Sequence, residues 1–191
     1  MRTGRGGTSV TVVPVSSSGL DARADPTRDY VDAIARFDAA TADETAQGVI
    51  EVCRSRQMPL LTFINKWDRP GREALELLDE IEEQIGLTAA PVTWPVGIAG
   101  DFRGVVDRRT GDFVRFTRTA RGATEAPEEI VDPARAADEE GAAWTTAADE
   151  LDLLSGSGLD HDEELFLGGE LSPTFFGSAV TNFGVRLLLD A

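Results

Sequence analysis

The stretch Pro59-Leu-Leu-Thr-Phe-Ile-Asn65 is a continuous apolar run as long as one β-strand, and Asn65-Lys66-Trp67-Asp68 completes it. Such runs are typical of a parallel strand buried on both faces of a sheet. An amphipathic helix is expected next over Pro70–Ile85, because Pro favours a first helical turn and Gly86 ends the pattern. Another helix is expected before the strand, over Ala42–Arg56. The order helix, buried strand, helix indicates a doubly wound α/β fold.

Shorter elements are expected around this core. A weak strand is predicted over Val31–Phe37 and another over Val92–Val96, and a hairpin over Arg103–Asp107 and Asp112–Thr117. The other expected elements are a loop over Arg118–Ala134, a helix over Ala134–Leu154, a short helix over Asp160–Leu167 capped by Asp160, a buried strand over Pro173–Phe176 and a last helix over Phe183–Leu189.

Charge and composition exclude several classes of function. The chain has 191 residues, 41% of them hydrophobic, and a formal net charge of −16. An acidic surface repels a phosphate backbone, so DNA is not an expected partner. No apolar run approaches the roughly 20 residues that span a membrane. The single cysteine, Cys53, is expected to be a buried thiol, and the chain is predicted to be cytoplasmic.

The end of the central strand carries the first chemical signal. Ligands of open α/β sheets bind at the carboxyl ends of the strands, and Asn-Lys-x-Asp is the pattern of guanine recognition in GTPases. Guanine presents two donors, N1–H and the exocyclic amine, and the Asp68 carboxylate can accept both. Asn65 is expected to bridge neighbouring loops, and the stem of Lys66 to lie over the purine. The alternative for these four residues alone is a surface turn.

A second signal follows the last buried strand, at Phe175-Phe-Gly-Ser178-Ala179. In GTPases a Ser-Ala pair after the next strand supplies a backbone N–H to guanine O6. Ala179 is predicted to donate this hydrogen bond and Ser178 to hold the turn, because only a small residue lets the backbone approach the base. The dipeptide alone is uninformative, but after an Asn-Lys-x-Asp strand it supports guanine recognition.

Longer stretches resemble the peptide chain release factor 3 family of translational GTPases. The resemblance covers about Val31–Ala191 and is most specific in Leu60–Glu83, Ala90–Gly97, Phe102–Asp107 and Leu165–Gly184. Elongation factor G shares the guanine motifs, but Thr93-Trp-Pro95 and Phe175–Ala179 favour the release factor family.

The resemblance implies the C-terminal part of a P-loop GTPase G domain, with a mostly parallel sheet, flanking helices and an inserted small α+β subdomain. Residues 31–89 and 169–191 would belong to the G domain and 90–168 to the insertion. Residues 1–30 stay unassigned and are expected to be poorly ordered, or to contain one strand at Ser9–Val15. The implied ligand is GTP or GDP, with Mg expected for the intact family. The implied partners in translation termination are the ribosome and decoding release factors.

The sequence departs from this family in the phosphate-binding half. A P-loop has the pattern G-x-x-x-x-G-K-[ST], whose Lys reaches the β- and γ-phosphates, but the only Lys here is Lys66. Gly4–Ser9 is glycine-rich without that Lys. The only histidine, His161, is expected to be a solvated surface residue. No catalytic or metal-binding residue is therefore predicted, and GTP hydrolysis by this chain alone is not expected.

Two alternative hypotheses stay open. The acidic insertion is compatible with a non-catalytic interaction module that docks a translation partner without nucleotide. The chain is also compatible with a non-functional relic, whose exposed sheet edge would invite aggregation. The carboxylate clusters Asp138–Glu140 and Asp160–Glu164 are expected to be solvated helix faces, because they lack the alternating ligand spacing of a calcium loop.

Overall fold

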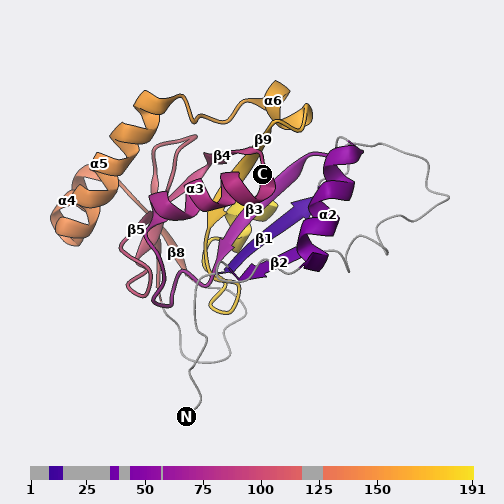
Figure 1. Cartoon of the computed structure of the whole chain (residues 1–191). Helices are drawn as coiled ribbons and strands as arrows, with labels where there is room; N and C mark the ends of the chain where they lie inside the picture. Colours follow the sequence, from indigo (N-terminus) through magenta and orange to yellow (C-terminus); the bar gives the residue numbers. More distant parts are fainter. Residues whose placement is uncertain (1–8, 15–34, 39–43, 57, 118–126) are drawn as a thin grey trace, which may run out of the picture.

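Two β-sheets with flanking helices make up the fold (Figure 1). The computed structural model describes residues 9–14, 35–38, 44–56, 58–117 and 127–191. The first sheet has the strand order β2-β1-β3-β9-β4, and the second has the order β5-β6-β7-β8. The expected α/β class, with a second and smaller group of strands and helices, is confirmed.

The first sheet is mixed. Strand β9 runs parallel to β3 and β4, whereas β1 runs antiparallel to β2 and β3. The β-like run near the N-terminus is therefore a paired strand, and the rest of residues 1–30 lies outside the described residues. The strands of this sheet are β1 (Ser9–Pro14), β2 (Ala35–Asp38), β3 (Leu60–Asn65), β4 (Thr88–Pro91) and β9 (Leu171–Phe176).

Strands β3 and β9 form the buried centre of this sheet. Every residue of β9 is buried, as is typical of a parallel strand covered on both faces. The hydroxyls of Thr62 and Ser172 lie 2.7 Å apart, and Ser172 donates to the carbonyl of Leu60. Both buried hydroxyls are thus satisfied, which allows polar side chains at the centre of the sheet.

Two helices belong to this layer, α2 (Glu44–Ser55) and α3 (Ala74–Ile85). Helix α3 begins four residues after the expected Pro70, and it ends where predicted. Gly86 closes it in the left-handed region with φ 64° and donates its N–H to the carbonyl of Glu82. The buried face of α3 consists of Ala74, Leu77, Leu78, Ile81 and Ile85.

The second sheet is antiparallel throughout. Its strands are β5 (Thr93–Val96), β6 (Gly104–Asp107), β7 (Phe113–Phe116) and β8 (Glu128–Val131). The hairpin of β6 and β7 is as predicted, but β8 lies inside the segment expected to be a loop. Only the last residue of β8 is buried, so its sequence lacks the alternation that identifies a strand. Ala90 and Pro91, placed in the insertion by the expected boundary, pair with β9 of the first sheet.

The acidic segment after β8 forms two helices rather than one, α4 (Pro133–Glu140) and α5 (Ala142–Ser157). Gly141 separates them with φ 56° and ψ −122°. Glycine adopts this conformation readily, but it is not helical, so the helix is interrupted there. Asp132 caps α4 by accepting a hydrogen bond from the N–H of Ala134. Among the described helices, none is long and apolar enough to cross a membrane.

The predicted cap of the next helix was wrong. Helix α6 (Glu163–Leu167) is capped by Asp162, whose carboxylate accepts from the N–H of Leu165 at 3.0 Å. Asp160 instead pairs with Arg108 at 2.6 Å. The last helix is α7 (Val185–Leu189), two residues shorter than expected.

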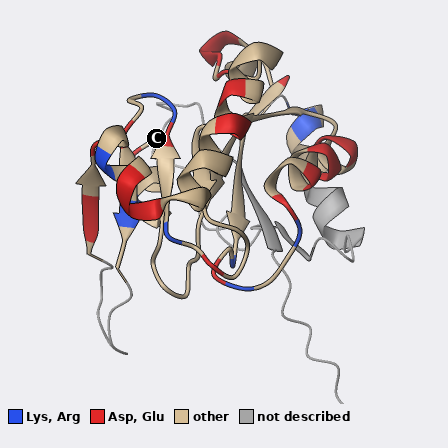
Figure 2. Cartoon of the chain, turned by 90° about the vertical axis from the view of Figure 1, so that its left-hand side faces the viewer, with Lys and Arg blue, Asp and Glu red and all other residues tan. Residues whose placement is uncertain are grey.

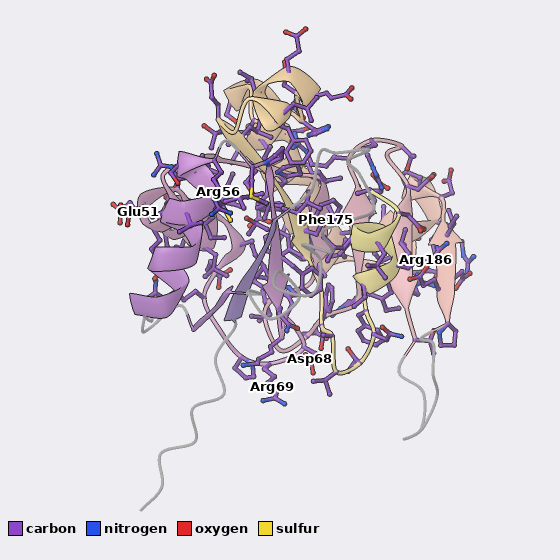
Figure 3. The ribbon with its side chains drawn as sticks, turned by 90° about the vertical axis from the view of Figure 1, so that its right-hand side faces the viewer. Glu51, Arg56, Asp68, Arg69, Phe175 and Arg186 are labelled. Atoms are coloured by element: carbon purple, nitrogen blue, oxygen red, sulfur yellow. The ribbon has the colours of Figure 1, made fainter. Side chains whose placement is uncertain are left out.

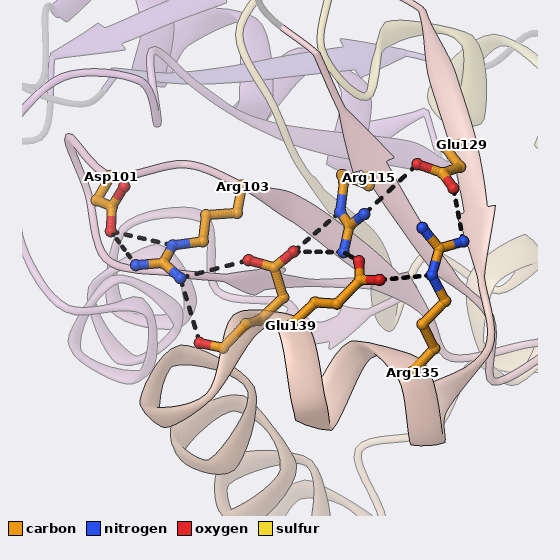
Figure 4. Close-up of polar contacts among 7 residues, drawn as sticks. Asp101, Arg103, Arg115, Glu129, Arg135 and Glu139 are labelled. Carbon is orange, nitrogen blue, oxygen red and sulfur yellow. Dashed lines mark hydrogen bonds and ion pairs between the residues drawn. The ribbon is translucent and has the colours of Figure 1, made fainter.

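Ion pairs fasten α4 to the second sheet (Figure 4). Arg115 of β7 lies at their centre, with nitrogens 2.6 Å from Glu139 and 2.7 Å from Glu140. Arg135 bonds to Glu139 and Glu129, and hydrogen bonds from Arg135 and then Arg115 lower the pKa of Glu139. Charged residues of α4 thereby pair with Arg115 of β7 and Glu129 of β8.

Candidate functional site

The two predicted guanine motifs lie at one edge of the first sheet. Asn65 is the last residue of β3, and Ser178 and Ala179 follow β9. Because β3 and β9 are adjacent and parallel, their carboxyl ends meet at the same edge. Figure 3 shows Phe175 within the sheet and Asp68 in the loop beyond its end. The fold therefore brings together residues more than 100 positions apart.

Asn65 ties the two motifs to each other. Its Oδ1 accepts hydrogen bonds from the backbone N–H of Ala179 at 2.9 Å and of Lys66 at 2.7 Å. Two backbone bonds run beside it, from Gly177 N–H to the carbonyl of Ile64 and from Trp67 N–H to the carbonyl of Gly177. The bridging geometry expected of Asn65 is thus present in the structure.

Ala179 does not present a free N–H in this arrangement. Its predicted role is to donate to guanine O6, but the hydrogen is directed to Asn65 Oδ1. A bound base could receive it only by sharing the hydrogen or by displacing the Asn65 oxygen. The role predicted for Ala179 accordingly requires that Asn65 Oδ1 share or release this hydrogen.

The motif turns sharply at Lys66. This residue has φ 64°, in the left-handed region that non-glycine residues rarely adopt. The strain is of the order of 1 kcal/mol or more. The turn is closed by a hydrogen bond from Arg69 N–H to the Lys66 carbonyl at 3.0 Å. It reverses the chain directly after β3 and keeps Lys66 and Asp68 at the sheet edge.

Trp67 occupies the variable position of the motif, and its buried side chain anchors the motif to the core. Its ring is buried and meets Phe176 edge-on, with ring centroids 5.0 Å apart. Its carbonyl accepts from Gly100 N–H at 2.9 Å, and its indole Nε1 lies 3.4 Å from the carbonyl of Gly97. Sequence reasoning did not predict this anchoring role, although a large aromatic residue between polar neighbours after a strand was a visible signal.

Two buried polar atoms at this edge lack a hydrogen-bond partner. Within the described residues, Asp68 Oδ1 and Ser178 Oγ are the only buried side-chain oxygens or nitrogens of this kind. Unsatisfied buried polar atoms are rare in folded proteins, and each calls for an explanation such as local strain, ordered water or a bound ligand. Both atoms belong to the predicted guanine motifs.

Gly177 allows the backbone after β9 to pack closely against Phe183 and Phe63. A Cβ atom there would lie 2.4 Å from the carbonyl oxygen of Phe183 and 2.6 Å from the ring of Phe63. Ser178 and Phe183 bond to each other through both backbone groups, at 2.9 and 3.0 Å. The loop that carries Ser178 and Ala179 is therefore closed and tightly packed.

Comparison with known proteins identifies the family. Residues 31–191 match the family described as the elongation factor Tu GTP binding domain. The chain belongs to this family. The matched region includes both predicted guanine motifs and excludes β1.

Relatives of this GTP-binding domain are translation factors. The chain is 44% identical to peptide chain release factor 3 of Microcystis aeruginosa over 163 residues, which cover 83% of this chain and 30% of the relative. It is 47% identical to peptide chain release factor 3 of Synechococcus elongatus over 146 residues, 75% of this chain and 26% of the relative. The resemblance to this group of translational GTPases is thus confirmed, and the chain spans about a third or less of their length.

One solved structure shows a similar fold. A protein from Thermus thermophilus superposes with a TM-score of 0.52 and 19% identity, over 95% of this chain and 31% of the other. At this identity the likeness concerns the fold alone.

Other candidate residues stand outside the site. His161 is exposed, with its ring 6.0 Å from that of Phe166. Cys53 is buried, and burial raises the pKa of its thiol. Across the described ranges, no group of three or more His, Cys, Asp or Glu side chains could hold a metal ion.

Proposed function

We propose that this GTP-binding domain chain binds the guanine base of GDP or GTP at the edge formed by Asn65, Lys66, Asp68, Ser178 and Ala179. The observation that carries the proposal is the pair of unsatisfied buried atoms, Asp68 Oδ1 and Ser178 Oγ, at the meeting point of two adjacent parallel strands. A base with donors at N1 and at its exocyclic amine supplies the hydrogen bonds that Asp68 lacks.

Each residue has a distinct part in this proposal. Asp68 accepts from the two guanine donors, and the stem of Lys66 covers a face of the purine. Asn65 holds the two loops together, and Ser178 holds the second loop closed. Ala179 donates its backbone N–H to guanine O6 once Asn65 releases or shares it.

Binding is proposed to be weak and without turnover by this chain alone. In P-loop NTPases, a lysine of the glycine-rich loop reaches the β- and γ-phosphates. The single lysine of this sequence, Lys66, belongs to the proposed base-reading motif instead. Magnesium is expected for the intact family, bound largely through the nucleotide phosphates.

The wider role is also a proposal. Since the chain spans only part of the release factor 3 relatives, we propose that the guanine site serves translation termination, with the ribosome and decoding release factors as partners. The relatives' name concerns those longer proteins, and a contact of this chain with the ribosome needs its own test.

Calorimetric titration with GDP and ADP tests base recognition. We expect GDP to bind and ADP not to bind, because adenine cannot offer the paired donors. Asp68→Ala should weaken GDP binding by about tenfold or more, since a hydrogen bond to a charged group contributes about 1.5–3 kcal/mol. Asp79→Ala is the matched control, because Asp79 is an exposed aspartate on α3. Equal binding of GDP and ADP would refute the proposal.

A further inference from the structure

A cavity lies next to the predicted guanine motif at Trp67. It opens between the start of α3, the loop joining β5 to β6, and α5, and its volume is about 260 Å³. Its walls are mostly apolar and include Trp67, Pro95, Ile98, Ala143 and Ala147. Ile98 is 60% exposed and also lines the cavity. An apolar group can therefore contact Ile98 at the entrance as well as the apolar walls inside.

Three carboxylates line the same cavity, and none of its described lining residues is Lys or Arg. Asp101 is paired with Arg103 at 2.9 Å. Glu73 and Glu150 form no ion pair within the described part of the chain. Glu150 accepts one hydrogen bond, from the indole N–H of Trp94 at 2.9 Å. Burial, and then the charge of Glu73, raise the pKa of Glu150 against the effect of that bond.

An apolar cavity with two carboxylates that form no ion pair within the described residues is complementary to a cation on a hydrocarbon stem. We propose that it binds an arginine or lysine side chain of a partner protein, with the stem against Ala143 and Ala147 and the charge beside Glu73 and Glu150. An apolar residue next to the cationic one contacts Ile98. Side chains of this kind bury their methylene groups while the charged end keeps a polar partner.

The surrounding surface favours a protein over a nucleic acid as the occupant. Figure 2 looks onto the side that carries α4 and α5, where Asp and Glu are prominent on the helices. With a net charge of −16, the chain repels a phosphate backbone and attracts a basic segment. A bare metal ion fits less well, because hard cations need several oxygen ligands and these walls are mainly apolar.

The cavity shares Trp67 with the guanine site. Trp67 lines the cavity, and its backbone lies between Lys66 and Asp68 and receives a hydrogen bond from Gly100. An occupied cavity therefore contacts the residue that holds the guanine motif in place. Any effect of an occupied cavity on GDP affinity rests on the proposed nucleotide function. Binding of a side chain in the cavity does not, so the cavity proposal and the guanine proposal can fail separately.

Binding is tested on the full chain by ¹H–¹⁵N NMR titration with N-acetyl-Ile-Arg-amide and N-acetyl-Ile-Lys-amide. N-acetyl-Ile-citrulline-amide is the neutral control, with nearly the shape of the arginine peptide. We expect the cationic peptides to shift the indole resonance of Trp67 and the amides of Gly97 and Ile98, and to bind at least about tenfold more tightly than the citrulline peptide.

Variants locate the site without relying on one substitution. Glu150→Gln keeps an acceptor for Trp94 but removes the charge, and should weaken the arginine peptide by about tenfold. Ala143→Leu fills the cavity without changing charge, and should abolish the shifts. Asp149→Asn is the matched control, because Asp149 is exposed on the same helix and does not line the cavity.

Three results would overturn the proposal: equal binding of the citrulline peptide, shifts confined to other surfaces, or unchanged binding by Glu150→Gln in a folded variant. A GDP titration in the presence of the arginine peptide separates the two proposals. If GDP never binds while the peptide does, the guanine proposal fails and the cavity proposal stands.

Discussion

Asp68 combines partial burial with an oxygen that has no hydrogen-bond partner within the described structure. Leaving such a group unsatisfied costs about 1–3 kcal/mol. The neighbouring Lys66 adds backbone strain, with φ 64°. Two unfavourable features so close together in the chain are characteristic of a binding site, where a ligand supplies the missing interactions.

Asp68→Asn should change which base is bound. Asn replaces one acceptor oxygen by an NH₂ donor, so it faces a guanine donor with another donor. Xanthine carries a carbonyl where guanine carries its amine, and it therefore matches Asn. We expect GDP affinity to fall by about tenfold or more and xanthosine diphosphate to become the better ligand in calorimetry. If both nucleotides lose affinity equally, Asp68 does not read the base.

Glu150 should make stability depend on pH. Burial raises its pKa, so its ionised form opposes folding, and its contribution to stability is lost as pH rises through the raised pKa. Glu73 and Asp101 are the other acids around the same cavity. Allowing for partial exposure, Glu150→Gln should raise the thermal midpoint at pH 7 by about 1–2 °C. The gain should shrink on acidification, and a gain that grew as pH fell would contradict this sign.

At the scale of elements, close packing at Gly177, directly after β9, holds the loop that carries Ser178 and Ala179. Gly177→Ala should destabilise the chain by about 1–3 kcal/mol, the usual range for overpacking, because its Cβ meets the Phe183 carbonyl and the Phe63 ring. Gly156→Ala is the control, since a Cβ there on α5 would meet no atom within 4 Å beyond its chain neighbours and its own helix backbone. That change should be neutral or stabilising by up to about 1 kcal/mol. Urea unfolding measures both, and equal stabilities would contradict the packing described here.

Strong local signals predicted some elements and missed others. The apolar run of β3 and the left-handed Gly86 after α3 were readable because burial and helix termination act locally. Strand β8 could not be predicted in this way, because only Val131 is buried and the strand forms through its pairing with β7, which depends on the tertiary fold. In the site, the motifs predicted the residues but not the Asn65–Ala179 bond, which depends on how two distant loops pack.

At the scale of the whole molecule, both guanine motifs share one sheet edge, while the sequence has no P-loop lysine. Phosphates add little favourable interaction without such a loop, and the charge of −16 repels them. We therefore expect guanosine to bind within about tenfold of GDP, a difference below about 1.4 kcal/mol. A chain that binds guanosine should also unfold in a single cooperative transition. The absence of such a transition would favour the relic hypothesis.

The most direct test is a calorimetric titration of the chain with guanosine, alongside GDP and adenosine. The account predicts that guanosine binds, that GDP binds about equally well and that adenosine does not bind. No guanosine binding by a folded chain, or GDP binding clearly more than about tenfold tighter than guanosine, would contradict it, because recognition would then not reside in the base-reading motifs alone.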